Sequence, residues 1–459
     1  MGDCIAAIST PPGEGGIAVI RVSGESAPEI VDKVFMSRSG KKLHEFKTHS
    51  LNLGYIRDEN GTLIDEVLVS RMDAPHSYTG ENVVEINCHG GAVATRRCLE
   101  LVINAGARLA HPGEFTKRAF LNGRLDMVQA EAVIEIIRAR SEKALALSTR
   151  NLRGALSKTL QQVEEELIFI NSRIEGSIDF PEEVGEPDWL ELEERLQAVE
   201  GRLQKLAAGS KRARVYRDGV RVVIAGKPNV GKSSLLNVLA QKERAIVTEI
   251  PGTTRDLIED LIYIKGIPVW VTDTAGIRET RDVIESMGVE KTRTALAEAD
   301  IVVFVVDAST GIQVEDLEIM QQIEDKRKLV VINKTDIQDR SLSAEEVRNI
   351  FSGINLVEIS ALEETGIEEL ESALEKMIVG KKDPEEAEPE IMTNLRQERA
   401  IEAALGHVQD AIDGVKKRQP IDGIAVDTWG AVSWIEEITG KAIRTDVMER
   451  IFADFCIGK

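Results

Sequence analysis

The stretch Gly226 to Ser234, GKPNVGKSS, has the residue types and the spacing of a loop that holds the phosphates of a nucleotide. It fits the pattern G-x-x-x-x-G-K-S, and it lies between the strand-like run VRVVIA and the helical run SLLNVLA. Backbone N–H groups at the start of such a helix would surround a phosphate. Lys232 would reach the β- and γ-phosphates, and the Ser233 hydroxyl would bind Mg²⁺. We therefore predict nucleotide binding here.

A second motif concerns the base. NKTD, from Asn333 to Asp336, follows the apolar run KLVVI. A carboxylate at Asp336 can accept hydrogen bonds from N1–H and the 2-amino group of guanine, whereas adenine lacks both donors and would leave it unpaired. SAL, from Ser360 to Leu362, follows the next strand-like run and would place a backbone N–H on the base oxygen. These motifs predict GTP rather than ATP.

Two further stretches have the character of switch loops, which respond to the γ-phosphate. In PGTTRD, Thr254 would close on Mg²⁺ and the γ-phosphate. In DTAGIRE, Asp273 would hold the metal through water, and Gly276 would donate its N–H to the γ-phosphate.

The residue after Gly276 is Ile277, where many small GTPases have a water-orienting Gln, and Ile277 has no atom that can hold a water. Arg255 and Arg278 lie in the same loops, but proximity in sequence does not make an arginine finger. The side-chain carbonyl of Asn229 would face the bridge between the β- and γ-phosphates. A K⁺ ion held by it and by loop carbonyls would supply preorganised positive charge. Three acids in ETRDVIESMG are then candidates to orient the water, and the residues alone do not separate them: Glu279, Asp282 and Glu285.

The order of elements predicts a multidomain chain, since 459 residues suggest two to four domains. Residues 1–118 alternate short strand-like runs with turns, as an α+β domain does. Residues 119–218 have apolar residues at helical spacing. Residues 219–380 alternate strand-like with helix-like segments. After the linker KKDPEEAEPE, helical spacing of apolar residues returns in 381–459. We expect an α/β nucleotide domain inserted into a helical domain built from both flanks.

The net charge of −21 is concentrated in 219–380, which has 18 Lys and Arg against 29 Asp and Glu. The electrostatic field of the whole molecule would therefore not attract a nucleic acid. A contact with RNA must use a local basic patch or the surface of a partner protein. We expect no membrane span and no signal peptide. The four cysteines form no C-x-x-C pair, which favours neither a zinc ribbon nor a disulfide framework, and a cytoplasmic setting is expected.

Together, GKPNVGKSS, GTTRD, DTAGIRE, NKTD, the N-terminal PPGEGGIAVIRVSG and the final CIGK resemble the tRNA-modification GTPase family MnmE, also called TrmE, over the whole chain. The resemblance implies a folate-binding-like α+β N-terminal domain, an α-helical central domain and an inserted Ras-like α/β P-loop GTPase domain. That family has a hydrophobic residue where Ile277 stands, and K⁺-dependent dimerisation of its G domains activates GTP hydrolysis.

The resemblance also assigns ligands. It implies that K⁺ is bound by Asn229, by backbone groups of Thr248 and Ile250, and by Thr253. Mg²⁺ would be bound by Ser233 and Thr254, and Glu285 would orient the water. The expected catalytic residues are Glu285, Lys232 and Cys456. The expected GTP-binding residues are Asn229, Val230, Gly231, Lys232, Ser233, Ser234, Thr248, Glu249, Ile250, Pro251, Gly252, Thr253, Thr254, Asp273, Thr274, Ala275, Gly276, Asn333, Lys334, Asp336, Ser360, Ala361 and Leu362.

At the two ends of the chain, Arg21 and Glu85 are ambiguous from the residues alone, because a structural salt bridge would explain both. The resemblance implies that Arg21, Glu85, Arg124 and Lys459 bind 5-formyltetrahydrofolate or a related folate. Cys456 has two readings, a nucleophilic thiolate or a residue that packs the tail against the folate site. Prenylation is disfavoured because Gly458 fits a C-a-a-X box poorly.

The resemblance implies a homodimer that works with the flavin- and NADH-dependent protein MnmG in a heterotetramer. The pair adds an aminomethyl or carboxymethylaminomethyl group to the wobble uridine of tRNA, using a folate carbon. The alternative is a non-catalytic GTPase switch in ribosome assembly or the stress response.

Overall fold

The computed structural model describes residues 3–242, 259–273, 295–351, 353–380 and 391–459. The chain forms two compact units. Unit 1 combines Met1–Arg138, Ser148–Lys205 and Leu395–Lys459, and unit 2 combines Ala139–Leu147 with Leu206–Asn394.

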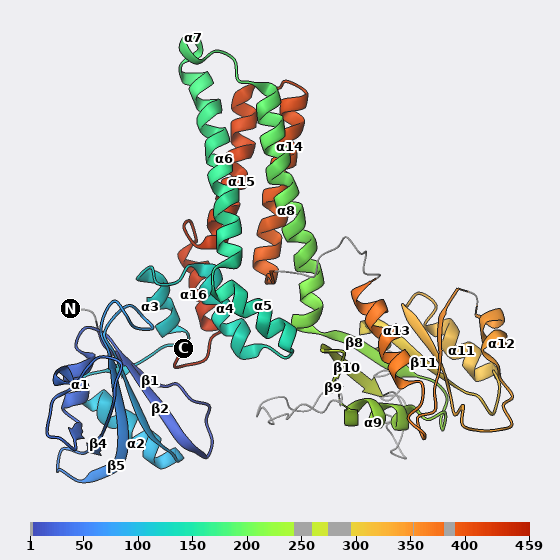
Figure 1. Ribbon diagram of the computed structural model, residues 1–459, viewed down its shortest axis with the longest axis horizontal. Coiled ribbons are helices and arrows are strands. Elements are labelled where there is room, and N and C mark those ends of the chain that lie inside the picture. The colour runs from blue at the N-terminus through green and yellow to red at the C-terminus, as the bar shows by residue number, and fades with distance from the viewer. Residues whose placement is uncertain (1–2, 243–258, 274–294, 352, 381–390) are drawn as a thin grey trace. The chain divides into compact units, whose positions relative to one another are not determined.

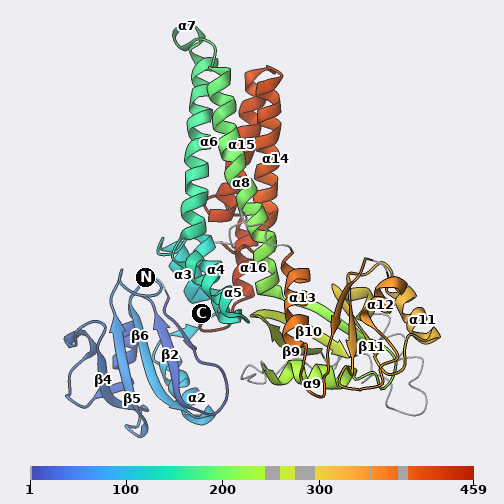
Figure 2. The same cartoon turned by 45° about the vertical axis from the view of Figure 1, so that its right-hand side comes forward.

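Unit 1 begins with a seven-stranded sheet whose strand order is β3-β4-β5-β6-β2-β1-β7. Neighbouring strands are antiparallel except for β1 and β7. Side chains alternate between the two faces of a strand, and Ile86 and Cys88 of β6 are buried with Leu101 and Val102 of α2, which lies against the sheet in Figure 2. The elements are β1 (Ile5–Ile8), β2 (Gly15–Ser23), α1 (Ala27–Asp32), β3 (Phe35–Ser37), the 3₁₀ turn η1 (Leu43–Glu45), β4 (Leu51–Arg57), β5 (Leu63–Met72), β6 (Val83–Gly90), α2 (Ala92–Asn104), β7 (Arg108–Leu109) and α3 (Glu114–Leu121).

The rest of unit 1 is helical. Helices α6, α8, α14 and α15 lie lengthwise beside one another in Figures 1 and 2. Each buries one apolar stripe, as Leu192, Leu196, Val199 and Leu203 do on α8. The helices are α4 (Met127–Arg138), α5 (Glu142–Leu152), α6 (Ala155–Asp179), α7 (Pro181–Val184), α8 (Trp189–Asp218), α14 (Leu395–Lys416), α15 (Ile421–Thr439) and α16 (Thr445–Ala453), of which α5 and α8 also enter unit 2.

The C-terminal tail belongs to unit 1 and packs near the N-terminal sheet. Phe452 and Phe455 join Met127 and Ala130 of α4 in a small apolar cluster. Beyond it, the Ser9 hydroxyl donates a hydrogen bond to the carbonyl oxygen of Gly458 at 3.0 Å. The last residues of the chain therefore lie beside β1 and β2.

Unit 2 contains a six-stranded sheet with the order β13-β12-β11-β8-β10-β9. All neighbours are parallel except β9 and β10, which form a hairpin. Apolar clusters cover both faces of this sheet, which explains why β11 is buried along its whole length. The elements are β8 (Val220–Ala225), α9 (Lys232–Lys242), β9 (Glu259–Ile264), β10 (Ile267–Asp273), β11 (Ile301–Asp307), α11 (Val314–Gln322), β12 (Lys328–Asn333), α12 (Ala344–Ile350), β13 (Asn355–Glu358) and α13 (Ile367–Val379).

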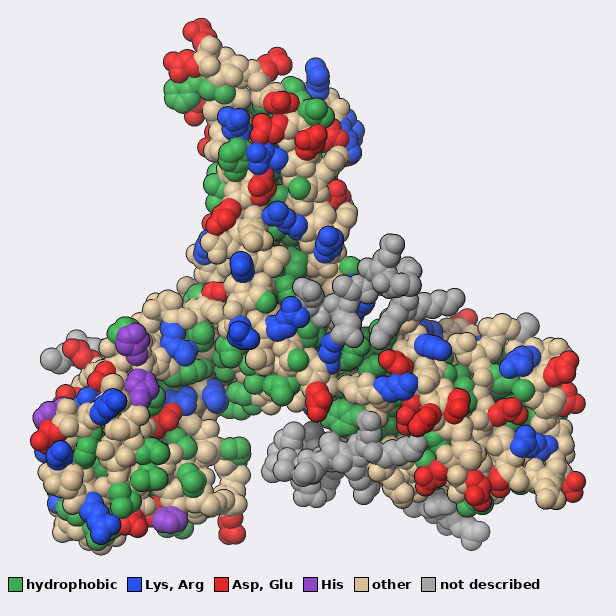
Figure 3. All heavy atoms as spheres, viewed as in Figure 1, with side chains coloured by type: hydrophobic (Ala, Val, Ile, Leu, Met, Phe, Trp, Pro, Cys, Tyr) green, Lys and Arg blue, Asp and Glu red, His purple; other side chains and the backbone are tan. Residues whose placement is uncertain are grey.

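The fold class expected from the sequence is confirmed: a sheet-based α+β part, a helical part and an α/β part with a mostly parallel sheet. The boundaries at residues 118, 218 and 380 remain predictions. In the described part of unit 2, Asp and Glu side chains are spread over the face that Figure 3 shows. Among the described residues, no helix combines the length and the apolar character needed to cross a membrane.

Candidate functional site

The predicted phosphate loop connects the end of β8 to the start of α9. Because β8, β11, β12 and β13 are parallel, their carboxyl ends share one edge of the sheet, where α/β proteins bind ligands. Lys232 opens α9 and is 5% exposed. Its Nζ donates to the carbonyl oxygens of Gly226 at 2.9 Å and Lys227 at 2.7 Å. The ammonium group therefore lies inside the loop, beside a helix N-terminus.

The predicted base loop is tied to the phosphate loop through Asn333. Its Nδ2 donates to the carbonyl oxygen of Val230 at 2.8 Å, and its Oδ1 accepts from the backbone N–H of Ala361 at 3.0 Å. Gly231 has φ +96°, and a Cβ added there would lie 2.2 Å from Asn333 Nδ2. Only glycine fits this close approach, so one buried amide holds three predicted segments together.

Asp336 and Lys334 of the predicted base loop each contact one neighbouring polar side chain. Asp336 is exposed, and one of its carboxylate oxygens accepts from the Ser360 hydroxyl at 2.6 Å. The Lys334 ammonium contacts Asp307 at 2.5 Å, at the end of β11. Burial alone would raise the pKa of Asp307, but the bonds from Lys334 and Ser309 outweigh it and lower that pKa. This ion pair ties the base loop to the end of β11.

A second lysine anchors the phosphate loop, and sequence reasoning missed it. Lys227 Nζ lies 2.7 Å from the buried carboxylate of Asp316 and 2.9 Å from Oε1 of Gln313, both at the start of α11. No sequence signal links these residues, because they are brought together only by the strand order.

The structure describes some of the other residues predicted to bind the nucleotide, and the rest lie outside the described residues. Asn229 is exposed at the tip of the loop with φ +64°, a conformation that Asn tolerates. Ser233 and Ser234 lie in the first turn of α9, and Leu362 is exposed after the base loop. Asp273 ends β10. Eleven predicted residues lie outside the described ones: Thr248, Glu249, Ile250, Pro251, Gly252, Thr253, Thr254, Thr274, Ala275, Gly276 and Glu285.

The four residues expected to bind folate converge in unit 1. Arg21 and Glu85 are direct cross-strand partners on β2 and β6, and their side chains form an ion pair at 2.8 Å. The Arg21 guanidinium lies over the ring of Tyr78 at 5.0 Å, and the Arg124 guanidinium lies over the same ring at 5.2 Å. Both are cation–π distances. Tyr78 therefore connects two arginines far apart in the sequence.

Lys459 completes this group through the tail. Arg21 also donates to the carbonyl oxygen of Gly458, and the backbone N–H of Phe115 donates to that of Lys459 at 3.2 Å. Burial is the largest influence on Lys459 and lowers its pKa, and the charge of Arg21 lowers it further. A half-buried ammonium with a lowered pKa gains from an anionic partner.

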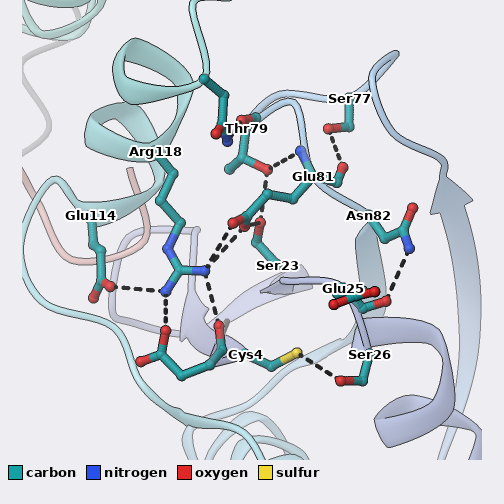
Figure 4. A network of polar contacts seen from close by, with 12 residues as sticks. Cys4, Ser23, Glu25, Ser26, Ser77, Thr79, Glu81, Asn82, Glu114 and Arg118 are labelled. Atoms are coloured by element: carbon teal, nitrogen blue, oxygen red, sulfur yellow. Dashed lines mark hydrogen bonds and ion pairs between the residues drawn. The ribbon is translucent and has the colours of Figure 1, made fainter. Parts of the chain in front are cut away.

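Ser77 and Thr79, the neighbours of Tyr78 in the chain, belong to a polar network that Figure 4 shows. Arg118 of α3 contacts Glu81 at 3.1 Å and Asp3 at 2.8 Å. Glu81 also accepts from the Ser23 hydroxyl at 2.8 Å. Sequence reasoning did not identify Tyr78, since a single aromatic residue in SYTG has no distinctive spacing.

Cys456 is exposed, and its carbonyl oxygen accepts from the backbone N–H groups of Gly113 and Lys459. Its backbone thus shapes the tail, while its thiol reaches the surface. The two readings of this cysteine both remain predictions.

The two sites fit the groups that the motifs imply. Lys232 and the start of α9 suit phosphate, the Ser233 hydroxyl suits Mg²⁺, and Asp336 suits guanine. Arg21 and Arg124 over the Tyr78 ring, with Lys459 near Arg21, suit an anionic aromatic ligand such as a folate. The fold and the first site define a P-loop GTPase.

The chain belongs to the tRNA modification GTPase MnmE family. The family model for the MnmE helical domain matches residues 127–456, and the model for the GTP-binding protein TrmE N-terminus matches residues 4–124. The MnmE of Syntrophomonas wolfei is 50% identical over 100% of both chains. That of Moorella thermoacetica is 47% identical and that of Carboxydothermus hydrogenoformans 48% identical, again over 100% of both chains. The protein is therefore a GTP hydrolase of tRNA modification that uses GTP and Mg²⁺.

Proposed function

We propose that this GTPase works with the flavoprotein MnmG to add an aminomethyl or carboxymethylaminomethyl group at C5 of the wobble uridine of tRNA. The one-carbon unit comes from 5-formyltetrahydrofolate or a related folate. The observation that supports this proposal is the convergence of Arg21 and Arg124 over Tyr78, with Glu85 and Lys459 beside Arg21. A GTPase that acted only as a switch would have no use for such a group.

The residues of this site have complementary roles in the proposal. The two guanidinium groups and the ammonium group suit the carboxylates and the formyl oxygen of a folate. The half-buried ring of Tyr78 suits its pterin. Glu85 holds Arg21 in place through the ion pair, so that its guanidinium faces Tyr78.

The GTPase half of the proposal depends on K⁺. Asn229, backbone groups of Thr248 and Ile250, and Thr253 bind the ion, and Glu285 orients the attacking water. Mg²⁺ is bound by Ser233 and Thr254, and Lys232 stabilises charge on the phosphates. Of these, Asn229, Lys232 and Ser233 are described, and they lie at one end of the phosphate loop. The ion supplies the positive charge that an arginine finger supplies elsewhere.

The proposal includes a homodimer formed by the N-terminal domains and a heterotetramer with MnmG in the cytoplasm, where tRNA is modified. The net charge of −21 means that this chain repels the tRNA backbone at long range. MnmG would therefore supply most of the tRNA-binding surface, and this chain would supply the folate-binding site and the GTPase cycle.

A folate-binding titration tests the proposal against the switch alternative. The full chain should bind 5-formyltetrahydrofolate, and Arg21→Ala should weaken binding by at least about tenfold through loss of a charge-assisted contact. Arg96→Ala on α2 is the matched control, because Arg96 is an exposed arginine paired only with Glu100 among the described contacts. If neither the unchanged chain nor the control binds folate, a GTPase switch without folate chemistry becomes the better account.

A further inference from the structure

Asp65, Cys88 and Cys98 come together in the N-terminal part of unit 1, and none of them belongs to the two sites described above. One carboxylate oxygen of Asp65 and the two Sγ atoms all lie within 4.8 Å of one another. In a tetrahedral site with metal–sulfur bonds of about 2.3 Å, two sulfur ligands are about 3.8 Å apart. Small side-chain movements would therefore bring these three atoms onto one ion.

The two thiols are positioned by a strand, a turn and a helix. Cys88 lies near the end of β6, and Cys98 lies in the second turn of α2. Cys88 is 2% exposed and Cys98 is fully buried. The Cys88 thiol donates a hydrogen bond to the carbonyl oxygen of Ala18 at 3.5 Å. Both sulfurs therefore point into the same interior space beside Asp65.

The Asp65 carboxylate is held from the solvent side by His89. The backbone N–H of His89 donates to Oδ2 at 2.8 Å, and Nδ1 of its ring lies 2.6 Å from Oδ1. Hydrogen bonds of this kind orient the ligand carboxylates of metal sites. The His89 side chain is 70% exposed and that of Asp65 is 9% exposed. Asp65 thus lies between solvent and the buried thiols, where an ion would enter.

We propose that Asp65, Cys88 and Cys98 bind one thiophilic divalent cation of the zinc class, with water as the fourth ligand. Two thiolates and one carboxylate are a ligand set that suits Zn²⁺ and disfavours Mg²⁺ and Ca²⁺. Each S–H bond is replaced by a sulfur–metal bond, and the two protons are released to solvent. The site would join β5, β6 and α2 of the N-terminal sheet, and it is independent of the proposed folate chemistry.

Cobalt substitution tests this proposal. The full chain is freed of metal under reducing conditions and titrated with Co²⁺, and a thiolate-to-cobalt charge-transfer band should appear and saturate at one ion per chain. Oxygen ligands at the GTP site give no such band. Cys98→Ser should abolish the band, and His89→Ala should weaken binding about tenfold. Cys456→Ser is the control and should keep the band, since that thiol is exposed and lies elsewhere.

A second measurement uses the unchanged chain, because a substitution in the core can also unfold the domain. Competition of the full chain with a chromophoric zinc chelator should show one Zn²⁺ retained per chain, and Zn²⁺ should raise the Tm of unfolding. The proposal fails if no thiolate band forms, if Cys98→Ser keeps it, or if the thiols form a disulfide and take up no metal.

Discussion

The Nδ2 atom of Asn333 donates a hydrogen bond to the carbonyl oxygen of Val230 at 2.8 Å, so the predicted base loop and the phosphate loop are joined by one buried side chain. The same side chain accepts from the N–H of Ala361. The shape of the nucleotide site is therefore fixed by an amide that need not touch the nucleotide.

Asn333→Ala should lower the affinity for GTP and GDP alike. It leaves the Val230 carbonyl and the Ala361 N–H without their partner in a buried place, at a cost of about 1–3 kcal/mol each, which predicts a loss of at least tenfold. Titration with a fluorescent guanine nucleotide measures it. Asn349→Ala, on the exposed face of α12, is the control. Unchanged affinity in Asn333→Ala would show that the bridge is dispensable.

GTP hydrolysis should be faster in K⁺ than in Na⁺, and Asn229→Ala should remove the difference. Loss of one preorganised charge-stabilising contact costs roughly 10²-fold in turnover. The measurement is the steady-state rate in matched salts, for the unchanged chain and for Asn229→Ala. Asn237→Ala, an exposed residue of α9, should keep the K⁺ dependence. Equal rates in both salts for the unchanged chain would contradict the proposed activation of GTP hydrolysis by K⁺.

Gly458→Ala should weaken folate binding and spare GTP binding. Gly458 has φ +94°, and a Cβ there would lie 2.3 Å from the carbonyl oxygen of Ile8, so the tail must move. Lys459 would move with it. Gly176→Ala is the matched control, because a Cβ at Gly176 meets no atom within 4 Å. Isothermal titration with 5-formyltetrahydrofolate measures both, and equal affinities would contradict the role of the tail.

Tyr78→Leu should weaken folate binding more than Tyr78→Phe. Phe keeps the ring under the two guanidinium groups and loses only the hydroxyl, which contacts the Thr116 hydroxyl at 2.8 Å. Leu removes both cation–π contacts, each worth about 0.5–2 kcal/mol. The same titration compares the two variants with the unchanged chain. If both variants bind as weakly as each other, the hydroxyl and not the ring positions the arginines.

Folate affinity should fall at alkaline pH through deprotonation of Lys459. Its pKa in the folded chain lies below the ordinary value of 10.5, because burial and then the charge of Arg21 disfavour the ammonium. At pH values between the lowered pKa of Lys459 in the folded chain and 10.5, the unfolded chain binds more protons than the folded chain. The free energy of unfolding therefore rises with pH across this window. Affinity for an anionic ligand falls over the same window, as the ammonium is lost.

The control for this pH profile is Lys459→Arg, because a guanidinium stays protonated throughout the window. Titrations at several pH values from about 7 upward should show a steeper loss in the unchanged chain than in this variant. If folate affinity falls equally with pH in the unchanged chain and in Lys459→Arg, another group causes the loss at alkaline pH.

The sequence predicted features that depend on residues close together in the chain, but not contacts between residues far apart in it. The strand before Gly226 and the helix after it follow from local patterns, and both were confirmed. Local patterns could not show that Arg21 pairs with Glu85, because the pair arises from the register of β2 against β6. Tyr78, the Lys227–Asp316 contact and the Cys88–Cys98 group likewise depend on topology, and no spacing in the chain indicates them.

The most direct test of the central claim is a reconstitution of the full chain with MnmG, its flavin and NADH, tRNA, GTP, Mg²⁺ and K⁺, followed by analysis of the wobble nucleoside. Our account predicts modified uridine only when a one-carbon folate is present, and little or none with Arg21→Ala. Modification that proceeds equally without folate, or equally with Arg21→Ala, would contradict it.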